Sequence, residues 1–208
     1  LVLIPSQMFN AIDSVPLTAI AFFMLTGELM TSATITDRLV ALSRALIGRI
    51  RGGLAQVNVL VSMFFAGMNG SVVADTATVG ALVLPAMKKA GYPAAFSAAV
   101  TGVSSTIGGI IPPSIMMIVL ANSTEISIAA LFAAGIVPGV LIGVVIMIIN
   151  HYFAIKYNFE RSDEPSSIRR AGKELYRSSF ALLIPLVLVG SVMGGVASVV
   201  EAGAITAM

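Results

Sequence analysis

Three long segments without a charged residue constrain the fold of this chain more than any other feature. They span residues 90–124, 126–155 and 178–200, and each exceeds the roughly 20 residues with which a helix crosses a bilayer. Hydrophobic residues make up 57% of the chain and charged residues only 11%, whereas soluble domains carry about 25% charged residues. The sequence therefore predicts an all-α integral membrane protein with several crossings.

The basic residues indicate how the predicted helices are oriented. All twelve lie in three clusters, which are Arg38, Arg44, Arg49 and Arg51; Lys88 and Lys89; and Lys156, Arg161, Arg169, Arg170, Lys173 and Arg177. Short loops rich in Lys and Arg stay in the cytoplasm, so all three clusters are expected on that side of the membrane. The net charge of +2 then favours contact with lipid head groups rather than with nucleic acid.

The first fifty residues are expected to lie at or across the membrane. Residues 14–30 cross inward, and residues 34–50 form a basic amphipathic helix at the inner surface. Residues 1–12 are either the end of a preceding helix or an interfacial arm. The first residues lack the basic start that a cleavable signal peptide has. Because the chain has no initiator Met and stops inside an apolar run, we expect it to be part of a longer protein.

The last eighty residues are expected to form a second set of crossings. Residues 126–155 return inward, and residues 156–177 form a cytoplasmic loop with a short amphipathic helix. Residues 180–200 cross outward, and a further helix begins near Glu201. Small residues at four-residue spacing within 126–155 predict a face for close helix packing; they are Gly135, Gly139 and Gly143.

The segment between Arg51 and Lys88 is too short to cross the membrane twice, although both of its ends are expected in the cytoplasm. It therefore predicts a re-entrant hairpin. The arms are expected at 54–66 and 72–87, with an interrupted tip at 65–71.

The segment 92–122 is interrupted by glycines and prolines where an unbroken helix would be most stable. Gly108-Gly109 and Pro112-Pro113 weaken helix formation most, and the prolines offer no N–H group. Non-helical backbone at membrane depth survives only where protein or a water-filled cavity satisfies it. We therefore expect a broken helix with exposed carbonyl groups.

The two interruptions together predict a site for a desolvated alkali cation, which needs several hard oxygen ligands. The alternative is that the glycines only permit close packing and that the prolines only kink a helix. The predicted ligands are Asn69, Gly70, Ser71, Ser105, Thr106, Gly108, Gly109 and Pro112.

Three other polar residues have weaker predicted roles. Asp75 either caps the returning arm of the hairpin or contacts an ion or substrate, as Ser71 and Thr76 could also do. Glu28 lies near the inner end of its helix and is a candidate for a gating or intersubunit contact. His151, the only histidine, is expected to anchor at the interface.

Several function classes are not indicated by the sequence. The chain has no Cys, which excludes disulfides and thiolate metal sites. It also lacks a nucleotide-binding loop, a zinc motif and a nucleophile triad, so we expect neither an enzyme nor a cofactor.

The chain resembles the large membrane subunit of tripartite ATP-independent periplasmic (TRAP) transporters along nearly its whole length. The motifs that carry the resemblance are Gly52-Gly53-Leu54-Ala55-Gln56-Val57-Asn58-Val59-Leu60, Gly70-Ser71-Val72-Val73-Ala74-Asp75-Thr76-Ala77 and Ser105-Thr106-Ile107-Gly108-Gly109-Ile110-Ile111-Pro112-Pro113-Ser114. The family often has Pro where this chain has Gly109.

The resemblance implies a sodium-coupled symporter of the bacterial inner membrane that imports organic acids by an elevator mechanism. Typical cargo is a C4-dicarboxylate, sialic acid or a keto acid, and the partners are a small membrane subunit and a periplasmic substrate-binding protein. It further implies inverted repeats, of which this chain holds the first and the start of the second. The implied parts are scaffold and arm helices (1–51), a piece of the transport domain (52–123, with a hairpin at 52–89 and a broken helix at 92–123) and scaffold helices (124–208).

Two alternatives to this interpretation differ in function. One is a sodium/dicarboxylate symporter that works without a binding protein. The other is a scaffold or channel subunit that transports nothing itself and whose broken helices only pack.

Overall fold

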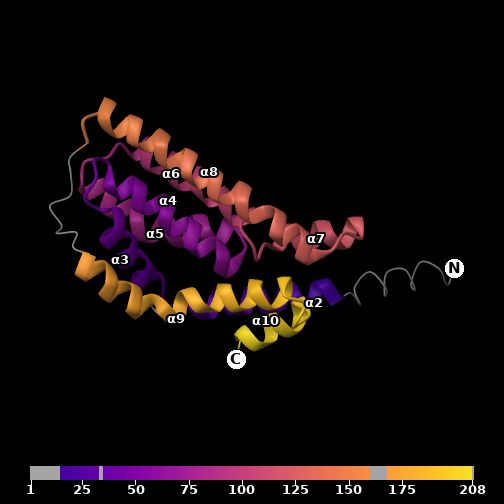
Figure 1. Cartoon of the computed structure of the whole chain (residues 1–208). Coiled ribbons are helices and arrows are strands. Elements are labelled where there is room, and N and C mark those ends of the chain that lie inside the picture. Colours follow the sequence, from indigo (N-terminus) through magenta and orange to yellow (C-terminus); the bar gives the residue numbers. More distant parts are fainter. Residues whose placement is uncertain (1–14, 33–34, 160–167, 208) are drawn as a thin grey trace.

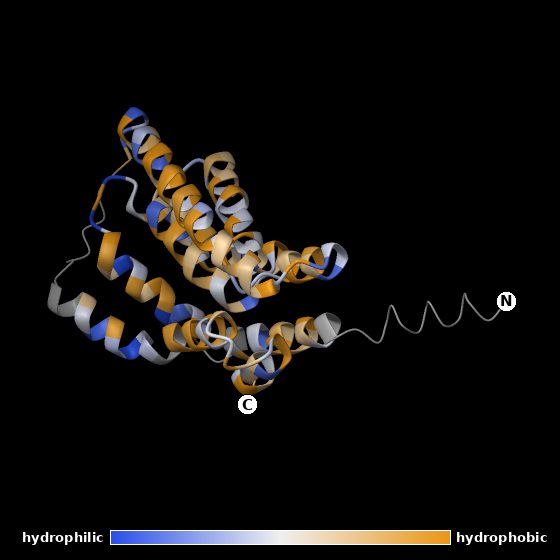
Figure 2. Cartoon of the chain, turned by 45° about the vertical axis from the view of Figure 1, so that its right-hand side comes forward, coloured by the Kyte–Doolittle hydropathy of each residue, from blue (hydrophilic) through white to orange (hydrophobic). Residues whose placement is uncertain are grey.

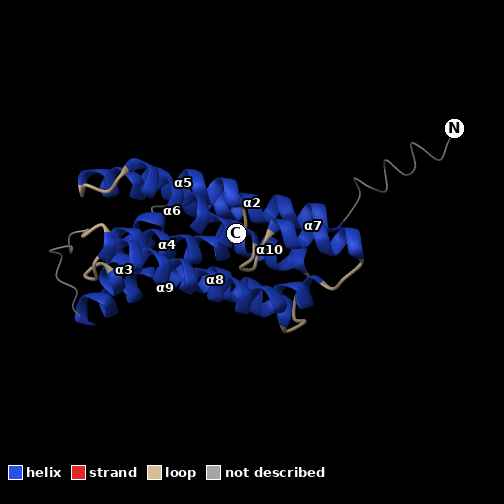
Figure 3. Cartoon of the chain, turned by 90° about the horizontal axis from the view of Figure 1, so that it is seen from above, coloured by secondary structure: helices blue, strands red, loops and turns tan. Residues whose placement is uncertain are grey.

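The computed structural model describes residues 15–32, 35–159 and 168–207, and these ranges consist of helices joined by short turns. No strand occurs within them (Figure 3). The predicted arm at 1–12 lies outside the described residues. In chain order the elements are α2 (Val15–Ser32), α3 (Ile35–Ile47), α4 (Gly53–Asn69), α5 (Val72–Lys89), α6 (Ala94–Ser105), the 3-10 turn η1 (Thr106–Gly109), α7 (Ile115–Thr124), α8 (Ile128–Lys156), α9 (Ile168–Met193) and α10 (Val199–Ala207).

Within the described ranges, α8 is the helix that by itself is long and apolar enough to cross a bilayer. The two segments of α9, Ala171–Ser179 and Leu182–Met193, pass the same test together but are bent by 56°. The helices carry long hydrophobic stretches (Figure 2). Apolar side chains along α8 are widely exposed, with 70% of Val137, 59% of Leu141 and 64% of Ile148 accessible. A contiguous exposed apolar face of this kind fits a lipid environment better than water.

The helices α4 and α5 form an antiparallel hairpin at the centre of the molecule (Figure 1). Val57 and Val61 of α4 and Val79 and Val83 of α5 are buried in the same apolar core. α6 packs on both helices of the hairpin, and α8 packs on α4. The hairpin is therefore covered on several sides by other helices of the same chain.

The hairpin turns at Gly70 and Ser71. Gly70 ends α4 with a left-handed φ of 59°, a conformation that favours glycine. The Ser71 hydroxyl then caps α5 by accepting a hydrogen bond from the Ala74 N–H at 3.4 Å. The predicted arms are confirmed as helices, but the predicted tip at 65–71 is too long, because α4 continues to Asn69.

Gly67 therefore lies inside α4 and is not part of the turn. A Cβ at this position would lie 3.4 Å from the Pro185 Cβ and 3.7 Å from the Pro112 carbonyl oxygen. The small residue allows α9 and the broken segment to approach the helix, which is the packing role that the alternative interpretation assigned to it.

The predicted broken helix is confirmed between α6 and α7. The 3-10 turn η1 follows α6 directly, and residues 110–114 then lie outside any helix, with the N–H groups of Ile110 and Ile111 still bonded back to the Ile107 carbonyl. α7 begins where the Ser114 hydroxyl accepts a hydrogen bond from the Met117 N–H at 3.4 Å. The irregular part of the break thus surrounds the prolines, whereas Gly108 and Gly109 remain in the 3-10 turn.

The glycine face of α8 packs against this break and against the hairpin. A Cβ on Gly135 would lie 2.5 Å from the Ile110 carbonyl oxygen, and a Cβ on Gly139 would overlap the Ile111 side chain. A Cβ on Gly143 would likewise overlap the Met63 side chain of α4. The predicted packing role of these glycines is confirmed, and it holds the break in place.

The amphipathic helix predicted at 34–50 is confirmed as α3, whose Leu39 and Leu42 are buried. Two hydrogen bonds join it to α9. The Arg38 guanidinium donates to the Arg177 carbonyl at 3.3 Å, and the Ser178 hydroxyl donates to the Arg38 carbonyl at 3.3 Å. A second apolar core joins α2, α9 and α10, which lie side by side (Figure 1), with Ile118 of α7 and Phe132 of α8.

The expected crossing at 180–200 needs correction at both ends. α9 already begins at Ile168, inside the expected loop, and ends at Met193. Gly195 has a φ of 67° and ends the helix in a turn. Ser198 and Glu201 then form a reciprocal capping box for α10, because the Glu201 carboxylate accepts from the Ser198 N–H at 2.7 Å and the Ser198 hydroxyl accepts from the Glu201 N–H at 3.3 Å.

Candidate functional site

The tip of the hairpin lies directly against the broken helix, although the two are separated by about forty residues in the sequence. The Ile115 N–H donates a hydrogen bond to the Gly70 carbonyl at 3.2 Å. A Cβ on Gly108 would lie 3.7 Å from the Ser71 carbonyl group. The two interruptions predicted from the sequence therefore meet at one place.

Gly70 is the closest point of this contact. A Cβ at this position would lie 2.5 Å from the Pro113 carbonyl oxygen and 3.1 Å from the Ile115 nitrogen. The first distance is shorter than any ordinary carbon–oxygen contact, and both partners are backbone atoms that cannot rotate away. Glycine is thus required here by space as well as by its left-handed backbone.

The broken segment offers a run of carbonyl oxygens without hydrogen-bond donors. Among the described residues, no N–H or O–H group donates to the carbonyls of residues 110–113. Pro112 and Pro113 also contribute no N–H of their own. Buried carbonyls normally have partners, so this run is suited to accept a ligand such as a cation.

The side chains at the hairpin tip add further oxygen atoms. Asn69 is buried, and its amide oxygen accepts a hydrogen bond from the Ser71 N–H at 3.1 Å. The Ser71 hydroxyl is the helix cap described above. Each of these oxygens has a second lone pair, so these bonds leave room for one more partner.

The structure does not turn the hydroxyls of Ser105 and Thr106 toward the hairpin tip. The Ser105 hydroxyl donates to the Thr101 carbonyl at 2.8 Å, and the Thr106 hydroxyl donates to the Val103 carbonyl at 2.7 Å. Thr106 is also exposed. Of the predicted ligands in this segment, Gly108 and Gly109 are the ones whose contacts reach Ser71 and Val72 at the tip.

Asp75 is completely buried between the hairpin and α6. Both of its carboxylate oxygens lack a hydrogen-bond partner among the described residues. The hydroxyls of Ser62 and Ser105 lie close enough to interact with the carboxylate but do not reach it with hydrogen-bond geometry. Because Ser71 caps α5, the capping interpretation of Asp75 is wrong.

The remaining weak candidates lie away from this contact. The Thr76 hydroxyl is exposed and donates to the Val72 carbonyl at 2.8 Å. Glu28 and His151 are exposed on α2 and α8. Within the described ranges, no three His, Cys, Asp or Glu residues gather as a metal cluster, so the oxygens at the break are mainly carbonyl and amide groups.

A buried polar network next to Asp75 was not predicted as part of the site. The Asn58 amide nitrogen donates to the Thr101 hydroxyl at 2.7 Å, and the Ser104 hydroxyl donates to the Asn58 amide oxygen at 3.2 Å. The Ser62 and Ser104 hydroxyls are 3.3 Å apart. The signal in the sequence is the pair of polar residues Asn58 and Ser62, one helical turn apart in an apolar helix.

This network predicts a clear effect on stability. Replacing Asn58 with alanine is expected to lower the free energy of unfolding by about 1–3 kcal/mol, because the Thr101 and Ser104 hydroxyls lose a buried partner. Thermal unfolding of the purified permease measures the loss. Asn122→Ala, at an exposed position in α7, is the control. Equal melting temperatures for the two variants would show that the network does not stabilise the fold.

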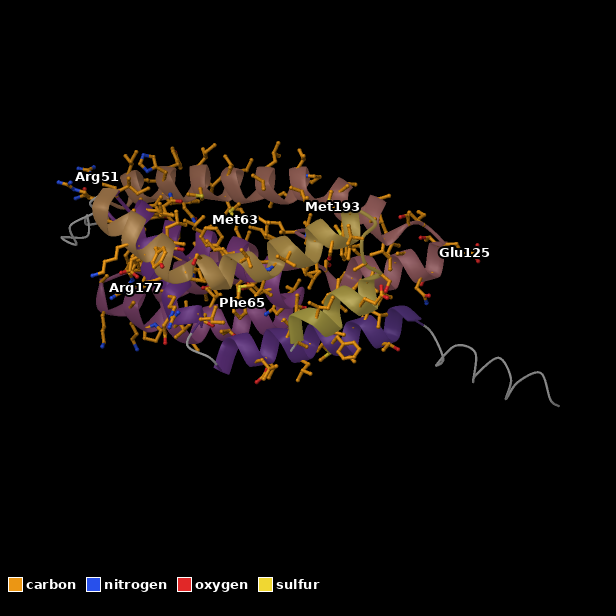
Figure 4. The ribbon with its side chains drawn as sticks, turned by 60° about the horizontal axis from the view of Figure 1, so that its bottom comes forward. Arg51, Met63, Phe65, Glu125, Arg177 and Met193 are labelled. Carbon is orange, nitrogen blue, oxygen red and sulfur yellow. The ribbon has the colours of Figure 1, made fainter. Side chains whose placement is uncertain are left out.

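Charged residues mark the two ends of the molecule. Arg51 and Arg177 lie at one end, and Glu125 lies at the other (Figure 4). Phe65, near the hairpin tip, is fully buried between them. The tip and the break therefore lie between the basic end of the molecule and the end that carries Glu125.

A family model and several curated proteins match this chain. The model for the DctM component of tripartite ATP-independent periplasmic transporters matches residues 1–208. The sialic acid TRAP transporter large permease protein SiaM of Vibrio cholerae is 35% identical over 97% of this chain and 47% of its own length.

Two further relatives are named for other compounds. The C4-dicarboxylate TRAP transporter large permease protein DctM of Pseudomonas aeruginosa is 36% identical over 97% of this chain and 47% of its own length. The 2,3-diketo-L-gulonate TRAP transporter large permease protein YiaN of Escherichia coli is 37% identical over 96% and 47%. The chain spans about half the length of these curated relatives.

Proposed function

Because the chain belongs to the DctM family of tripartite ATP-independent periplasmic transporters, we propose that it forms one coupling-ion site of a sodium-driven importer of organic acids. The observation that carries the proposal is the contact between the hairpin tip and the broken helix, with unpaired carbonyls at 110–113. Sodium is a hard cation that binds such oxygens, and here it is cargo that moves with the substrate.

The proposed sodium ligands come from both sides of this contact. The hairpin supplies the Asn69 amide oxygen and the backbone of Gly70 and Ser71, and the break supplies carbonyls near Gly108, Gly109 and Pro112. Ser105 and Thr106 take part through their backbone, since their hydroxyls are bound within α6. Sodium would hold the tip against the break and so favour the substrate-competent state, as thermodynamic linkage requires.

Asp75 is proposed to support the same step electrostatically. Its buried carboxylate lies one helical turn past the hairpin tip and has no partner among the described residues. A lone carboxylate inside a membrane protein is costly unless a cation or polar groups compensate it. A bound cation nearby provides that compensation.

The substrate is proposed to be an organic acid. The three relatives described above are named for sialic acid, a C4-dicarboxylate and 2,3-diketo-L-gulonate, all of which carry a carboxylate. We place the anionic group near Ser71, where the N-terminus of α5 favours negative charge. The proposed partners are a small membrane subunit and a periplasmic substrate-binding protein, in the bacterial inner membrane.

The proposed mechanism is of the elevator type. The hairpin and the broken helix move together as part of a transport domain, in which the hairpin is re-entrant, while α3, α8 and α9 belong to the scaffold. The dense packing of α6 on the hairpin supports their movement as one unit.

Sodium dependence of uptake tests this proposal. The complete transporter is reconstituted in liposomes, and Asn69→Ala is expected to raise the sodium concentration for half-maximal uptake about 10-fold. The loss of one ligand that contributes about 1.4 kcal/mol of binding free energy lowers the affinity for sodium by that factor. Asn122→Ala is the matched control. An unchanged sodium dependence in Asn69→Ala would remove this side chain from the site.

The two alternatives give different results in the same assay. A symporter without a binding protein would take up substrate when the periplasmic protein is omitted. A scaffold subunit would show no sodium-dependent change in melting temperature. We expect uptake to need the binding protein and sodium to raise the melting temperature.

A further inference from the structure

An open cavity of about 690 Å³ lies at the basic end of the molecule, apart from the proposed sodium site. It is formed by the end of α3, the turn into α4 and the last turns of α8. Its lining residues are Leu46, Ile47, Arg49, Ile50, Arg51, His151 and Ile155. The lining therefore combines basic side chains from two elements with aliphatic ones.

The turn that carries the two arginines is held firmly against α8. Gly52 has a φ of 70°, and a Cβ on it would lie 2.5 Å from the Ala154 Cβ. One turn further along α4, the Gln56 amide nitrogen donates to the Met147 carbonyl at 2.8 Å. The Asn150 amide nitrogen reaches the Ala55 carbonyl at 3.5 Å. The backbone that presents the cations is thus built into the fold.

Among the described residues, the basic groups of this cavity have no acidic counterpart. None of the described lining residues is a carboxylate, and no ion pair within the described ranges involves Arg49, Arg51 or His151. A neighbouring cavity between α3 and α9 differs in this respect, because it is lined by Asp37 and Glu174 as well as by two arginines. The excess of basic over acidic lining residues therefore distinguishes the first cavity from this neighbouring one.

The aliphatic residues around these cations are exposed. Leu46 is 49% accessible, Ile50 is 40% accessible and Ile155 is 53% accessible. In a membrane protein such side chains face acyl chains, and the basic end lies at the level of the head groups. Arg51 marks this end, opposite Glu125 (Figure 4). A ligand that fits must offer a phosphate to the arginines and hydrocarbon to the aliphatic residues.

We propose that this cavity binds the phosphate head group of one anionic phospholipid, and that the lipid joins the α3–α4 turn to α8. Arginine binds phosphate through several N–H groups at once. The cavity is open, so the acyl chains can leave it along the exposed aliphatic residues. Because α4 begins at Gly53, the cavity lies where the base of the hairpin meets α8.

Native mass spectrometry of the purified complete permease in neutral detergent tests the proposal. Phosphatidylglycerol is expected to bind at least 10-fold more tightly than phosphatidylcholine. The double variant Arg49→Gln, Arg51→Gln is expected to bind phosphatidylglycerol about 25-fold more weakly. Each basic residue contributes about 1 kcal/mol, which is about 5-fold in affinity. Lys88→Gln with Lys89→Gln removes the same charge from the exposed end of α5 and is expected to keep the tight site.

Two further measurements distinguish a lipid site from a site for free phosphate and from general attraction to charge. Inorganic phosphate, added at the same concentration as the lipid, is expected not to compete; if it displaces phosphatidylglycerol completely, the ligand is a free phosphate and the lipid assignment is overturned. If the two double variants lose the same affinity for phosphatidylglycerol, the lipid is attracted by the overall positive charge and not by a specific site. The single variants Arg49→Gln and Arg51→Gln are each expected to bind phosphatidylglycerol about 5-fold more weakly. Each variant is first checked for an unchanged melting temperature without lipid.

Discussion

Gly70→Ala is expected to abolish sodium-dependent uptake, to below about 1% of the wild-type rate. The added Cβ would lie 2.5 Å from the Pro113 carbonyl oxygen and 3.1 Å from the Ile115 nitrogen. Relief of this overlap requires that the hairpin tip move away from the break, which breaks the hydrogen bond from the Ile115 N–H to the Gly70 carbonyl. The proposed ligands on the two sides would then no longer converge on one ion.

Gly91→Ala is the matched control for this substitution. Gly91 also has a left-handed backbone, with a φ of 79°, but no atom lies within 4 Å of the position of its Cβ. Both alanines carry a similar backbone strain of about 1–2 kcal/mol. Only the alanine at Gly70 adds a collision with the broken segment.

Uptake and the sodium-dependent rise in melting temperature should be measured for both variants. We expect Gly91→Ala to retain both properties and Gly70→Ala to lose both, while remaining folded in a sodium-free buffer. Wild-type sodium dependence in Gly70→Ala would show that the close contact is not needed for ion binding. Equal losses in the two variants would attribute the effect to backbone strain alone.

The interruptions of the helices could be predicted from the sequence because their causes are local. Gly70 permits a left-handed turn, and Pro112 and Pro113 remove hydrogen-bond donors wherever they lie. The packing face of α8 was predictable for the same reason, since small residues at four-residue spacing lie on one side of any helix. These features depend on residue type and spacing, and the structure confirms them.

Side-chain directions around the site could not be predicted in this way. Ser105 and Thr106 can bond either to a ligand or to a carbonyl one turn earlier in their own helix, and the structure has the second arrangement. The same limit applies to Gly67, whose place inside α4 depends on what packs against it. Asn58 reveals its partners only when α6 is placed beside α4.

Asp75→Asn is expected to remove most of the sodium-dependent rise in melting temperature and most of the uptake. The substitution keeps the shape of the side chain but removes its charge. In the wild-type protein both carboxylate oxygens are buried without a partner among the described residues. An amide in their place is neutral, so its burial costs less free energy than that of an unpaired carboxylate. We therefore expect the sodium-free form of the variant to be at least as stable as the wild type.

Thermal unfolding across a series of sodium concentrations measures both effects. Breaking a favourable cation contact with a buried carboxylate commonly costs about 3–5 kcal/mol, so affinity should fall at least 100-fold. Asp37→Asn, at an exposed position in α3, controls for the change in net charge. It is expected to keep the wild-type response to sodium.

The direction of the change without sodium distinguishes a coupling role from a structural one. If Asp75 only held the hairpin to α6, Asp75→Asn would lower the melting temperature in sodium-free buffer and leave the added effect of sodium intact. If the carboxylate serves the bound cation, the sodium-free protein gains stability and the sodium effect disappears. Because a buried charge without a partner destabilises the ion-free state and is compensated in the ion-bound state, the two changes must have opposite signs.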